Sequence, residues 1–163
     1  MKQEKIRILF VCLGNICRSP SAEAVMIAMV EEHGLSKHFV IDSAGILGYH
    51  AGELPDKRMR AHAVRRGYSL VSHSRPVCMD DFYEFDKIIG MDDQNIADLK
   101  RLAPDVESMQ KIQRMTDFSL NQTDDHVPDP YYGGAEGFEH VLDLLEDACE
   151  GLLKVCQKEW EGR

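Results

Sequence analysis

The sequence contains no hydrophobic stretch long enough to cross a membrane. A membrane-spanning helix needs about 20 consecutive apolar residues, whereas the apolar stretch that follows the charged N-terminus, IRILFV, covers only residues 6–11. That stretch also lacks the small-residue cleavage site that a secretory signal peptide requires. We therefore expect a β-strand at 6–11, and we expect no membrane partner.

The chain has five cysteines, which is an odd number. The five cysteines do not have the spacing of a disulfide framework in a small secreted protein, and two of them lie on one expected helix. They are Cys12, Cys17, Cys78, Cys149 and Cys156. We therefore expect reduced thiols and a cytoplasmic location.

An excess of basic residues is also missing. The chain has 19 Lys and Arg residues against 28 Asp and Glu residues, which gives a net charge of −9. Nucleic acids and anionic membrane surfaces both favour a basic binding face, so we exclude them as main partners. A phosphorylated substrate remains compatible with this charge if positive groups gather locally around the phosphate.

Length and composition fit one globular domain. A chain of 163 residues can bury a substantial core but is too short for two comfortable domains. Hydrophobic residues make up 44% of the chain and charged residues 29%, which is ordinary for a folded protein. No internal repeat or low-complexity segment interrupts it. We therefore expect residues 1–163 to form a single domain.

Strand and helix signals alternate along the chain. Apolar runs of the kind that parallel sheets bury on both faces occur at 6–11, 39–45, 87–91 and, more weakly, 110–115. Helical periodicity is found at 19–34, 56–67, 93–103 and 135–158. This order predicts an α/β fold, a three-layer sandwich whose four-stranded sheet is mostly parallel.

The ends of two helices carry recognisable signals. Ser19 can cap the first helix and Pro20 suits its first position, while Gly34 ends it. The helix after the third strand is capped by Asp92 or Asp93. Between the fourth strand and the last helix, residues 116–134 form a long polar loop, and loops of this length in compact domains are usually functional.

The stretch VCLGNICRSP at 11–20 follows the first expected strand, at the edge where open α/β sheets bind ligands. Gly14 and Asn15 are the residue types that best tolerate a left-handed turn. Such a turn directs successive backbone N–H groups inward, and the next helix adds its free N–H groups and the positive end of its dipole. The stretch therefore predicts an anion-binding loop.

Three side chains of this loop suit phosphate chemistry. Arg18 can hold two phosphate oxygens at once. Because helix N-termini lower the pKa of a thiol from ~8.5 toward ~3.5–7.5, Cys12 can act as a thiolate nucleophile on phosphorus. Ser19 can donate a hydrogen bond to the sulfur and help it leave.

Other interpretations of the loop explain less. If Cys12, Cys17 and Arg18 only filled space, the register of the neighbouring Gly, Asn, Ser and Pro residues would be coincidence. A metal site lacks a second pair of ligands at suitable spacing. A Walker-type phosphate loop requires a lysine that is absent here.

Taken together, these residues resemble the low-molecular-weight protein tyrosine phosphatases. VCLGNICRSP, with its Cys-(x)5-Arg-Ser pattern, is followed in the family's order by DSAG, GYHAGELPDKR, DKIIGMDDQN and VPDPYYGG, so the match runs almost end to end. The resemblance implies a flavodoxin-like sheet with a phosphate-binding loop after the first strand. It also implies hydrolysis of phosphotyrosine through a cysteinyl-phosphate, with Cys12 as nucleophile and Arg18 as phosphate clamp, and with no metal or organic cofactor.

Cleavage of a phosphate ester by a thiolate needs a proton for the departing phenolate and later a base for water, and one carboxyl group can serve both steps. By resemblance that group is Asp129, which Pro130 holds in an extended conformation. Asp92 is the competing acid. Its place between a strand and a helix favours an N-cap, so we assign it a supporting role.

The resemblance also assigns the substrate pocket. Aromatic and aliphatic walls form a deep slot that favours the long, flat phosphotyrosine, because a phosphoserine could not reach its floor. The residues expected to contact substrate or phosphate are Leu13, Gly14, Asn15, Ile16, Cys17, Ser19, Tyr49, Tyr131 and Tyr132. His50 stands where many members have asparagine, which leaves the contacts on that rim open.

Two further features are implied by the resemblance. In the family, the loop asparagine is linked through a serine to a histidine, and the matching residues are Asn15, Ser43 and His73. Cys17 can close a reversible disulfide with Cys12 that protects the nucleophile from over-oxidation, in which case a thiol reductant is a partner.

Three alternatives to a tyrosine phosphatase remain. A thiol-linked arsenate reductase of the same fold needs additional cysteines on a mobile segment, and here only Cys78 is available. Family members that act on phosphoarginine carry threonine where this chain has Ile16, which favours tyrosine. A non-catalytic phosphate-binding module would need neither the thiolate of Cys12 nor the acid Asp129.

Overall fold

The computed structural model describes residues 5–161, apart from the side chain of Tyr132. Four strands form one sheet in the order β2-β1-β3-β4, and every neighbouring pair is parallel. The strands are β1 (Ile6–Cys12), β2 (Phe39–Gly45), β3 (Lys87–Gly90) and β4 (Ile112–Arg114). Each lies within or next to an expected strand, so the predicted α/β fold with a parallel sheet is confirmed.

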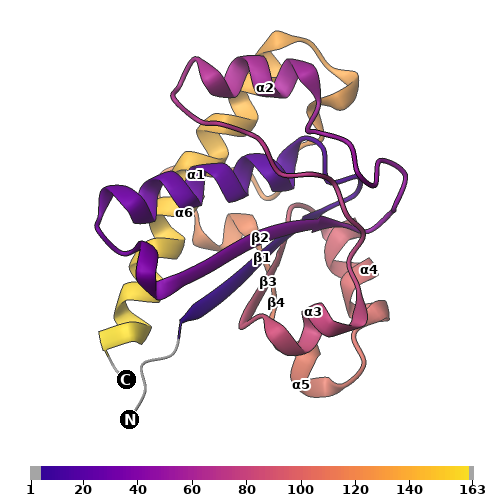
Figure 1. Cartoon of the computed structure of the whole chain (residues 1–163), viewed down its shortest axis with the longest axis vertical. Helices are drawn as coiled ribbons and strands as arrows, with labels where there is room; N and C mark the ends of the chain where they lie inside the picture. The colour runs from indigo at the N-terminus through magenta and orange to yellow at the C-terminus, as the bar shows by residue number, and fades with distance from the viewer. Residues whose placement is uncertain (1–4, 162–163) are drawn as a thin grey trace.

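Helices cover both faces of this sheet (Figure 1). Two long helices, α1 and α6, pack on one face and on each other, while α3, α4 and α5 lie on the other side. The shorter α2 packs against α6. The helices are α1 (Arg18–Glu32), α2 (Lys57–Val64), α3 (Met79–Glu84), α4 (Asp93–Leu102), α5 (Val106–Met109) and α6 (Ala135–Glu161). This is the expected three-layer arrangement.

Strand β1 lies at the centre of the core because both of its faces are apolar. Ile8 and Phe10 pack with buried residues of α1 and α6, whereas Leu9 and Val11 pack with buried residues of α3 and α4. All four side chains are fully buried. Since successive side chains of a strand point to opposite faces, an unbroken apolar run serves both layers at once.

The strand order places two loops at one point of the sheet edge. The chain runs from β1 outward to β2 and then returns to β3 on the other side of β1. Open α/β sheets bind ligands at such a reversal, outside the carboxyl ends of the strands. The loop after Cys12 and the N-cap residue Asp92 after β3 both lie at this edge.

The start of α1 differs from the expected start. The helix begins at Arg18, and Cys17 occupies the N-cap position without a capping side chain. Ser19 and Pro20 therefore lie inside the first turn, so the prediction of Ser19 as cap and Pro20 as first residue is wrong. The reason is that the Ser19 hydroxyl hydrogen-bonds within the preceding loop instead. The other end is confirmed, since Gly34 has a φ of 70° just beyond the helix.

Several short helices and turns lie between the expected elements, and no pattern in the sequence predicts them. Helices α3 and α5 have six and four residues, and three 3-10 turns cover Ser36–His38, Met115–Phe118 and Pro130–Tyr132. Segments of one turn are too short to show a helical period. Within the described residues 5–161, no helix combines the length and the apolar character needed to span a membrane.

Candidate active site

The loop between β1 and α1 bends at Asn15. This residue has a φ of 58°, which makes it the one non-glycine residue with positive φ in the described part of the chain. Gly14, the other candidate for the left-handed position, does not adopt it. A side chain at Gly14 would instead approach the ring of His50, since a Cβ there would lie 3.2 Å from His50 Cδ2. The left-handed turn is therefore confirmed and assigned to Asn15.

The Asn15 side chain holds the loop from within. It is almost fully buried, and its Nδ2 donates to the hydroxyls of Ser19 at 2.8 Å and Ser43 at 3.0 Å. Its Oδ1 accepts a hydrogen bond from the backbone N–H of Arg75 at 3.0 Å. One amide thus connects the loop to α1, β2 and the segment that docks beside β2. A buried side chain with all three contacts satisfied fixes the loop geometry.

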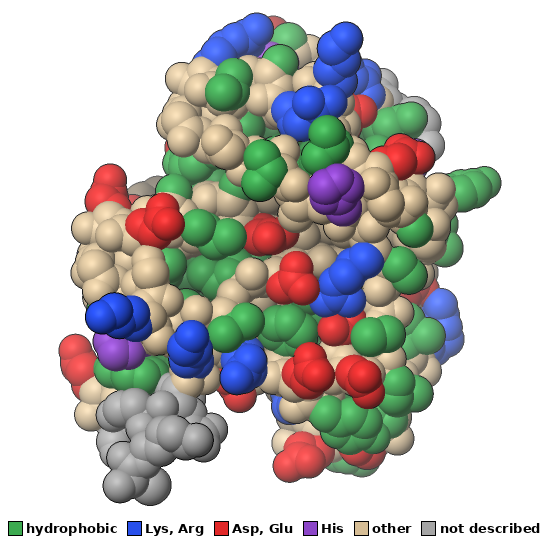
Figure 2. Space-filling model, viewed as in Figure 1, with side chains coloured by type: hydrophobic (Ala, Val, Ile, Leu, Met, Phe, Trp, Pro, Cys, Tyr) green, Lys and Arg blue, Asp and Glu red, His purple; other side chains and the backbone are tan. Residues whose placement is uncertain are grey.

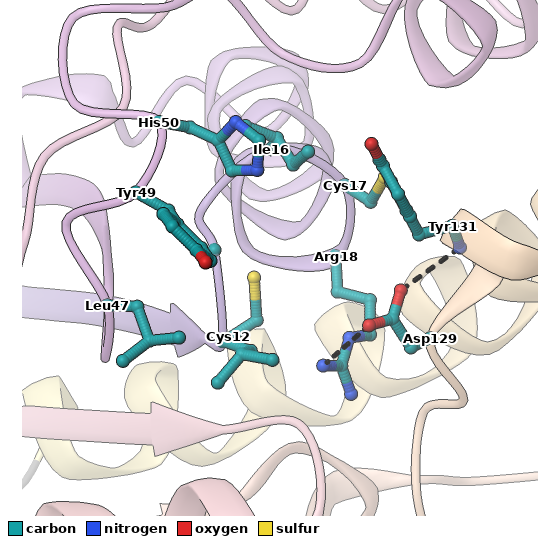
Figure 3. A pocket seen from close by; sticks show the side chains of 11 residues that line it. Cys12, Ile16, Cys17, Arg18, Leu47, Tyr49, His50, Asp129 and Tyr131 are labelled. Carbon is teal, nitrogen blue, oxygen red and sulfur yellow. Dashed lines mark hydrogen bonds and ion pairs between the residues drawn. The ribbon is translucent and has the colours of Figure 1, made fainter.

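Cys12 lies at the floor of this loop with its sulfur buried but facing a cavity (Figure 3). Cys12 Sγ is 3.0 Å from Ser19 Oγ, and the backbone N–H of Ser19 donates to the sulfur at 3.4 Å. Because Ser19 Oγ accepts from Asn15, its own hydrogen can point at the sulfur or at the Ala44 carbonyl oxygen, which lies 3.4 Å away. Ser19 thus contacts the sulfur through both its hydroxyl and its backbone N–H.

Arg18 is the cation of the site, and its side chain is 3% exposed. Its Nη1 donates to Asp92 Oδ2 at 2.6 Å and to the carbonyl oxygen of Val127 at 3.0 Å, and its Nη2 lies 3.7 Å from Asp129 Oδ2. Burial acts to lower the pKa of Arg18, but Cys12 and the Asp92 carboxylate outweigh it and raise the pKa. The guanidinium therefore keeps its charge although it is buried.

Asp129 reaches the cavity from the loop that precedes α6. It is the N-cap of the turn Pro130–Tyr132, where its carboxylate accepts a hydrogen bond from the Tyr131 N–H at 3.0 Å. Its side chain is 36% exposed. Figure 3 shows the carboxylate between Arg18 and Tyr131, on the side of the cavity away from Tyr49. The carboxyl group thus faces both the cation and the space above Cys12.

Arg58 of α2 holds the acid loop in place, and sequence reasoning missed it. Its Nη2 donates to the Tyr131 carbonyl oxygen at 2.9 Å and to Asp56 at 3.1 Å. Its guanidinium also lies 5.3 Å from the ring centroid of Tyr131 and 5.0 Å from that of Phe138. Several basic residues surround Arg58 in the sequence, so no pattern distinguishes it from a solvated surface charge.

These residues enclose a cavity of about 320 Å³. Its lining contains nine of the predicted site residues, namely Cys12, Leu13, Gly14, Ile16, Cys17, Arg18, Tyr49, Asp129 and Tyr131. Leu47 and His50 complete it, and Leu47 was not predicted. Four other predicted residues do not line the cavity, namely Asn15, Ser19, Ser43 and Asp92. The side chain of Tyr132 is outside the described part of the structure.

The predicted histidine in the supporting network is wrong. His73 is exposed, and the Ser43 hydroxyl donates at 2.5 Å to the carboxylate of Glu23 instead. Burial raises the pKa of Glu23, and the hydrogen bond from Ser43 opposes this only in part. A chain of hydrogen bonds therefore runs from the loop asparagine through Ser43 to a half-buried carboxyl group on α1. Sequence reasoning missed Glu23, because nothing in the sequence distinguishes it from the other glutamates of α1.

The other cysteines differ from Cys12. Burial, with the nearby Asp56 and Cys12, raises the pKa of Cys17, so this second thiol of the loop stays protonated. Cys78 is exposed and does not line the cavity. Among the residues whose side chains are described, no three His, Cys, Asp or Glu residues are grouped to hold a metal ion.

Comparisons with known proteins agree with this geometry. A crystal structure of a protein tyrosine phosphatase from Entamoeba histolytica, with Hepes in the active site, superposes with a TM-score of 0.93 at 47% identity, covering 95% of this chain and 99% of that one. A low molecular weight protein-tyrosine-phosphatase of Streptomyces coelicolor is 42% identical over 159 residues, which is 96% of this chain and 97% of that protein.

A third relative differs in its named substrate. The crystal structure of a Drosophila arginine phosphatase superposes with a TM-score of 0.86 at 31% identity, covering 91% of this chain and 96% of that one. Residues 7–161 of the present chain match the family described as low molecular weight phosphotyrosine protein phosphatase. The loop, the arginine and the acid described above come from the segments that first suggested this family. The chain belongs to the low molecular weight phosphotyrosine protein phosphatases.

Proposed function

We propose that this chain hydrolyses phosphotyrosine esters in two steps through a cysteinyl-phosphate. In the first step the Cys12 thiolate attacks phosphorus, the phosphorus–oxygen bond to the phenolate breaks, and Asp129 donates its proton to the departing oxygen. Arg18 and the inward N–H groups of the loop hold the non-bridging oxygens, where negative charge is spread in the transition state.

In the second step water replaces the sulfur. Asp129, now a carboxylate, takes a proton from the attacking water, the sulfur–phosphorus bond breaks, and inorganic phosphate leaves. The electron pair returns to Cys12, where the hydroxyl of Ser19 stabilises the thiolate through the 3.0 Å contact. Asp129 is then protonated again, as the next cycle requires.

One observation carries this proposal. The sulfur of Cys12, the guanidinium of Arg18 and the carboxylate of Asp129 line a single cavity, although they come from three separate elements. A protein that only bound phosphate would need the cation but neither the sulfur nor the acid. The exposed Cys78 offers no support for an arsenate reductase, which must pass oxidation from the catalytic thiol to further cysteines.

The cavity walls support phosphotyrosine as the substrate class. Leu13, Tyr49 and Tyr131 are all exposed at the rim, while Cys12 is buried at the floor. A phosphate on a flat, long side chain reaches that floor and places its ring among these walls. Ile16 supplies an apolar wall with no hydrogen-bonding group for a guanidinium, which favours tyrosine over arginine.

A phosphate-release panel tests the proposal. Phosphotyrosine, phosphoserine and phosphoarginine peptides of matched sequence are compared, and we expect release from the phosphotyrosine peptide alone. Cys12→Ser is expected to abolish release, and Asp129→Ala to accumulate a phosphate bound to cysteine that acid quenching and mass spectrometry detect. Full activity of Cys12→Ser contradicts the mechanism, and faster release from phosphoarginine contradicts the substrate class.

We further propose that Cys17 closes a reversible disulfide with Cys12 under oxidation. Both thiols line the same cavity, so once peroxide has oxidised Cys12 to a sulfenic acid, the sulfur of Cys17 can attack it and form the disulfide with release of water. Peroxide should then inactivate the enzyme, and a dithiol reductant should restore it. Cys17→Ser should lose activity permanently under the same treatment. Equal recovery of both forms contradicts the disulfide.

We also propose a cytoplasmic location and a single phosphatase domain. The five cysteines are all unpaired, which suits a reducing compartment. The proposed catalytic residues come from the end of β1, the start of α1 and the loop before α6, all around one sheet. Limited proteolysis followed by mass spectrometry should find no stable fragment smaller than the sheet with its helices. Cell fractionation tests the location, and recovery in a membrane or secreted fraction contradicts it.

A further inference from the structure

Positive charge is concentrated in one segment of this acidic chain. Residues 57–79 contain no Asp or Glu, although the whole chain has a net charge of −9. Figure 2 shows Lys and Arg side chains gathered over the end of the molecule where α2 lies. The basic residues of the segment are Lys57, Arg58, Arg60, Arg65, Arg66 and Arg75.

Several of these charges are compensated within the protein. Arg66 forms ion pairs with three carboxylates of α6 at 2.6 to 3.0 Å. Arg75 pairs with two carboxylates at 3.0 Å, and Arg58 pairs with Asp56 at 3.1 Å. No such ion pair is formed by Lys57 or Arg60 with any described residue, and the Arg60 Nε donates to a backbone carbonyl. Arg65, at the C-terminal end of α2, forms no such ion pair with a described residue either. We refer to the two that lie in the first turn of this helix, Lys57 and Arg60, as the two unpaired cations.

The two unpaired cations line a second cavity beside the first. Its volume is about 410 Å³, and it shares Ile16, His50 and Tyr131 with the cavity above Cys12. The shared residues form a partition between the two spaces, so an occupant of one is a neighbour of an occupant of the other. The second cavity is therefore positioned to contact the chain on either side of a bound phosphotyrosine.

The acidic side chains of the second cavity already have partners. Asp56 accepts hydrogen bonds from the backbone at the start of α2 and pairs with Arg58. Glu53 lies 3.0 Å from His50 Nδ1. His50 carries a charge only when protonated, so the Glu53 carboxylate is counted here as uncompensated. Lys57 and Arg60 still outnumber it, and the net charge left in this cavity is positive and attracts an anion.

We propose that the second cavity binds the carboxylate of an Asp or Glu in the phosphotyrosine-containing substrate, an inference that rests on the proposed function. The guanidinium of Arg60 can hold both oxygens of a carboxylate, and Lys57 adds a mobile point charge. An extended peptide advances about 3.3 Å per residue, so side chains within roughly three residues of the phosphotyrosine reach a neighbouring cavity. The enzyme thus selects phosphotyrosine in an acidic context.

Matched peptides test this subsite. Each peptide carries phosphotyrosine and one Glu or one Gln at a single position, from three residues before it to three residues after it. For wild-type protein we expect kcat/KM to be about 1.5- to fivefold higher with Glu than with Gln at the position that reaches the cavity, as partly exposed ion pairs allow. Each value is divided by the rate of the same preparation on 4-nitrophenyl phosphate, which corrects for the fraction of active protein.

Two double variants show whether the second cavity causes the preference for the Glu peptide. Lys57→Gln with Arg60→Gln should bring the ratio of Glu to Gln peptides close to one. Arg65→Gln with Lys100→Gln removes the same charge from exposed positions outside both cavities, and it should keep the wild-type ratio. Loss of the ratio in this control as well would mean that the general field of the protein, and not the cavity, selects the peptides, and it would overturn the proposal.

The remaining outcomes separate the subsite from the proposed function. If wild-type protein hydrolyses the Glu and Gln peptides at equal rates at every position, the subsite is wrong and the proposed function stands. If the preference survives in the Lys57 and Arg60 double variant, the subsite is also wrong. If no phosphotyrosine peptide is hydrolysed, the proposed function fails, and the subsite fails with it.

Discussion

Arg18 donates a 2.6 Å hydrogen bond to Asp92, although the two residues are 74 positions apart in the chain. The same carboxylate caps α4, because its Oδ1 accepts a hydrogen bond from the backbone N–H of Asn95 at 2.8 Å while Oδ2 faces Arg18. Each oxygen has its own partner. Asp92 therefore ties the start of α4 to the phosphate loop and orients the guanidinium that the proposed mechanism uses.

Asp92→Asn is expected to lower kcat/KM while the fold is kept. Asparagine caps helices about as well as aspartate, but its amide cannot accept from both Asn95 and Arg18. A hydrogen bond to a charged group contributes about 1.5–3 kcal/mol, so we expect a loss of roughly tenfold to a hundredfold in kcat/KM. Asp105→Asn, the same change at the N-cap of α5, is the control and should leave kcat/KM unchanged. Similar losses in both variants would contradict the orienting role.

Glu23 predicts a pH dependence of stability. Its pKa is raised by burial, so the folded protein holds the Glu23 proton more tightly than the unfolded chain does. Protonated Glu23 is therefore favoured in the folded state, and this contribution is lost as pH rises through the raised pKa. Glu23→Gln keeps the shape of the protonated form. Its free energy of unfolding relative to wild type should increase between about pH 4 and pH 7.

Urea unfolding at a series of pH values measures this difference. Glu31→Gln is the matched control, because Glu31 lies on the same helix and is exposed. The difference from wild type should change with pH more for Glu23→Gln than for this exposed control. Equal changes in the two variants would contradict the burial argument.

A pair of glycines in α6 gives a test of packing. A Cβ at Gly151 would lie 1.8 Å from the Phe118 carbonyl oxygen, whereas a Cβ at Gly137 would make only ordinary contacts. Gly151→Ala should therefore displace the turn that contains Phe118 and lower the free energy of unfolding by about 1–3 kcal/mol. Gly137→Ala, in the same helix, should be neutral or stabilise by up to about 1 kcal/mol. Denaturant unfolding measures both, and equal effects would contradict the close approach.

The sequence predicts most of the fold because the layers depend on local patterns. The apolar run of β1 and the periodicity of α6 are each readable within one window, and both are confirmed. The sequence does not predict where α1 begins. Its first turn is decided by Ser19, whose hydroxyl is taken by Cys12 and Asn15, and this choice depends on the folded loop.

The candidate site also has residues that the sequence predicts and residues that it does not. Cys12, Arg18 and Asp129 lie in motifs with characteristic neighbours, so their presence in one cavity could be predicted. Glu23 and Arg58 could not be predicted, since each is one of several similar charges on its helix. Which charge turns inward is decided by the register of α1 against β2 and of α2 against the acid loop. Such contacts between distant segments leave no local pattern.

Arg58 gives a final prediction, on the acid loop. Its guanidinium donates to both Asp56 and the Tyr131 carbonyl oxygen, which a lysine ammonium cannot do in the same planar arrangement. Arg58→Lys should therefore leave Asp129 less well positioned to protonate the leaving group. A phenolate that leaves poorly needs that proton more than 4-nitrophenolate does. The rate on phenyl phosphate should therefore fall several-fold more than the rate on 4-nitrophenyl phosphate. The control variant Arg65→Lys should change neither rate. Equal losses on both substrates would show that Arg58 acts on something other than Asp129.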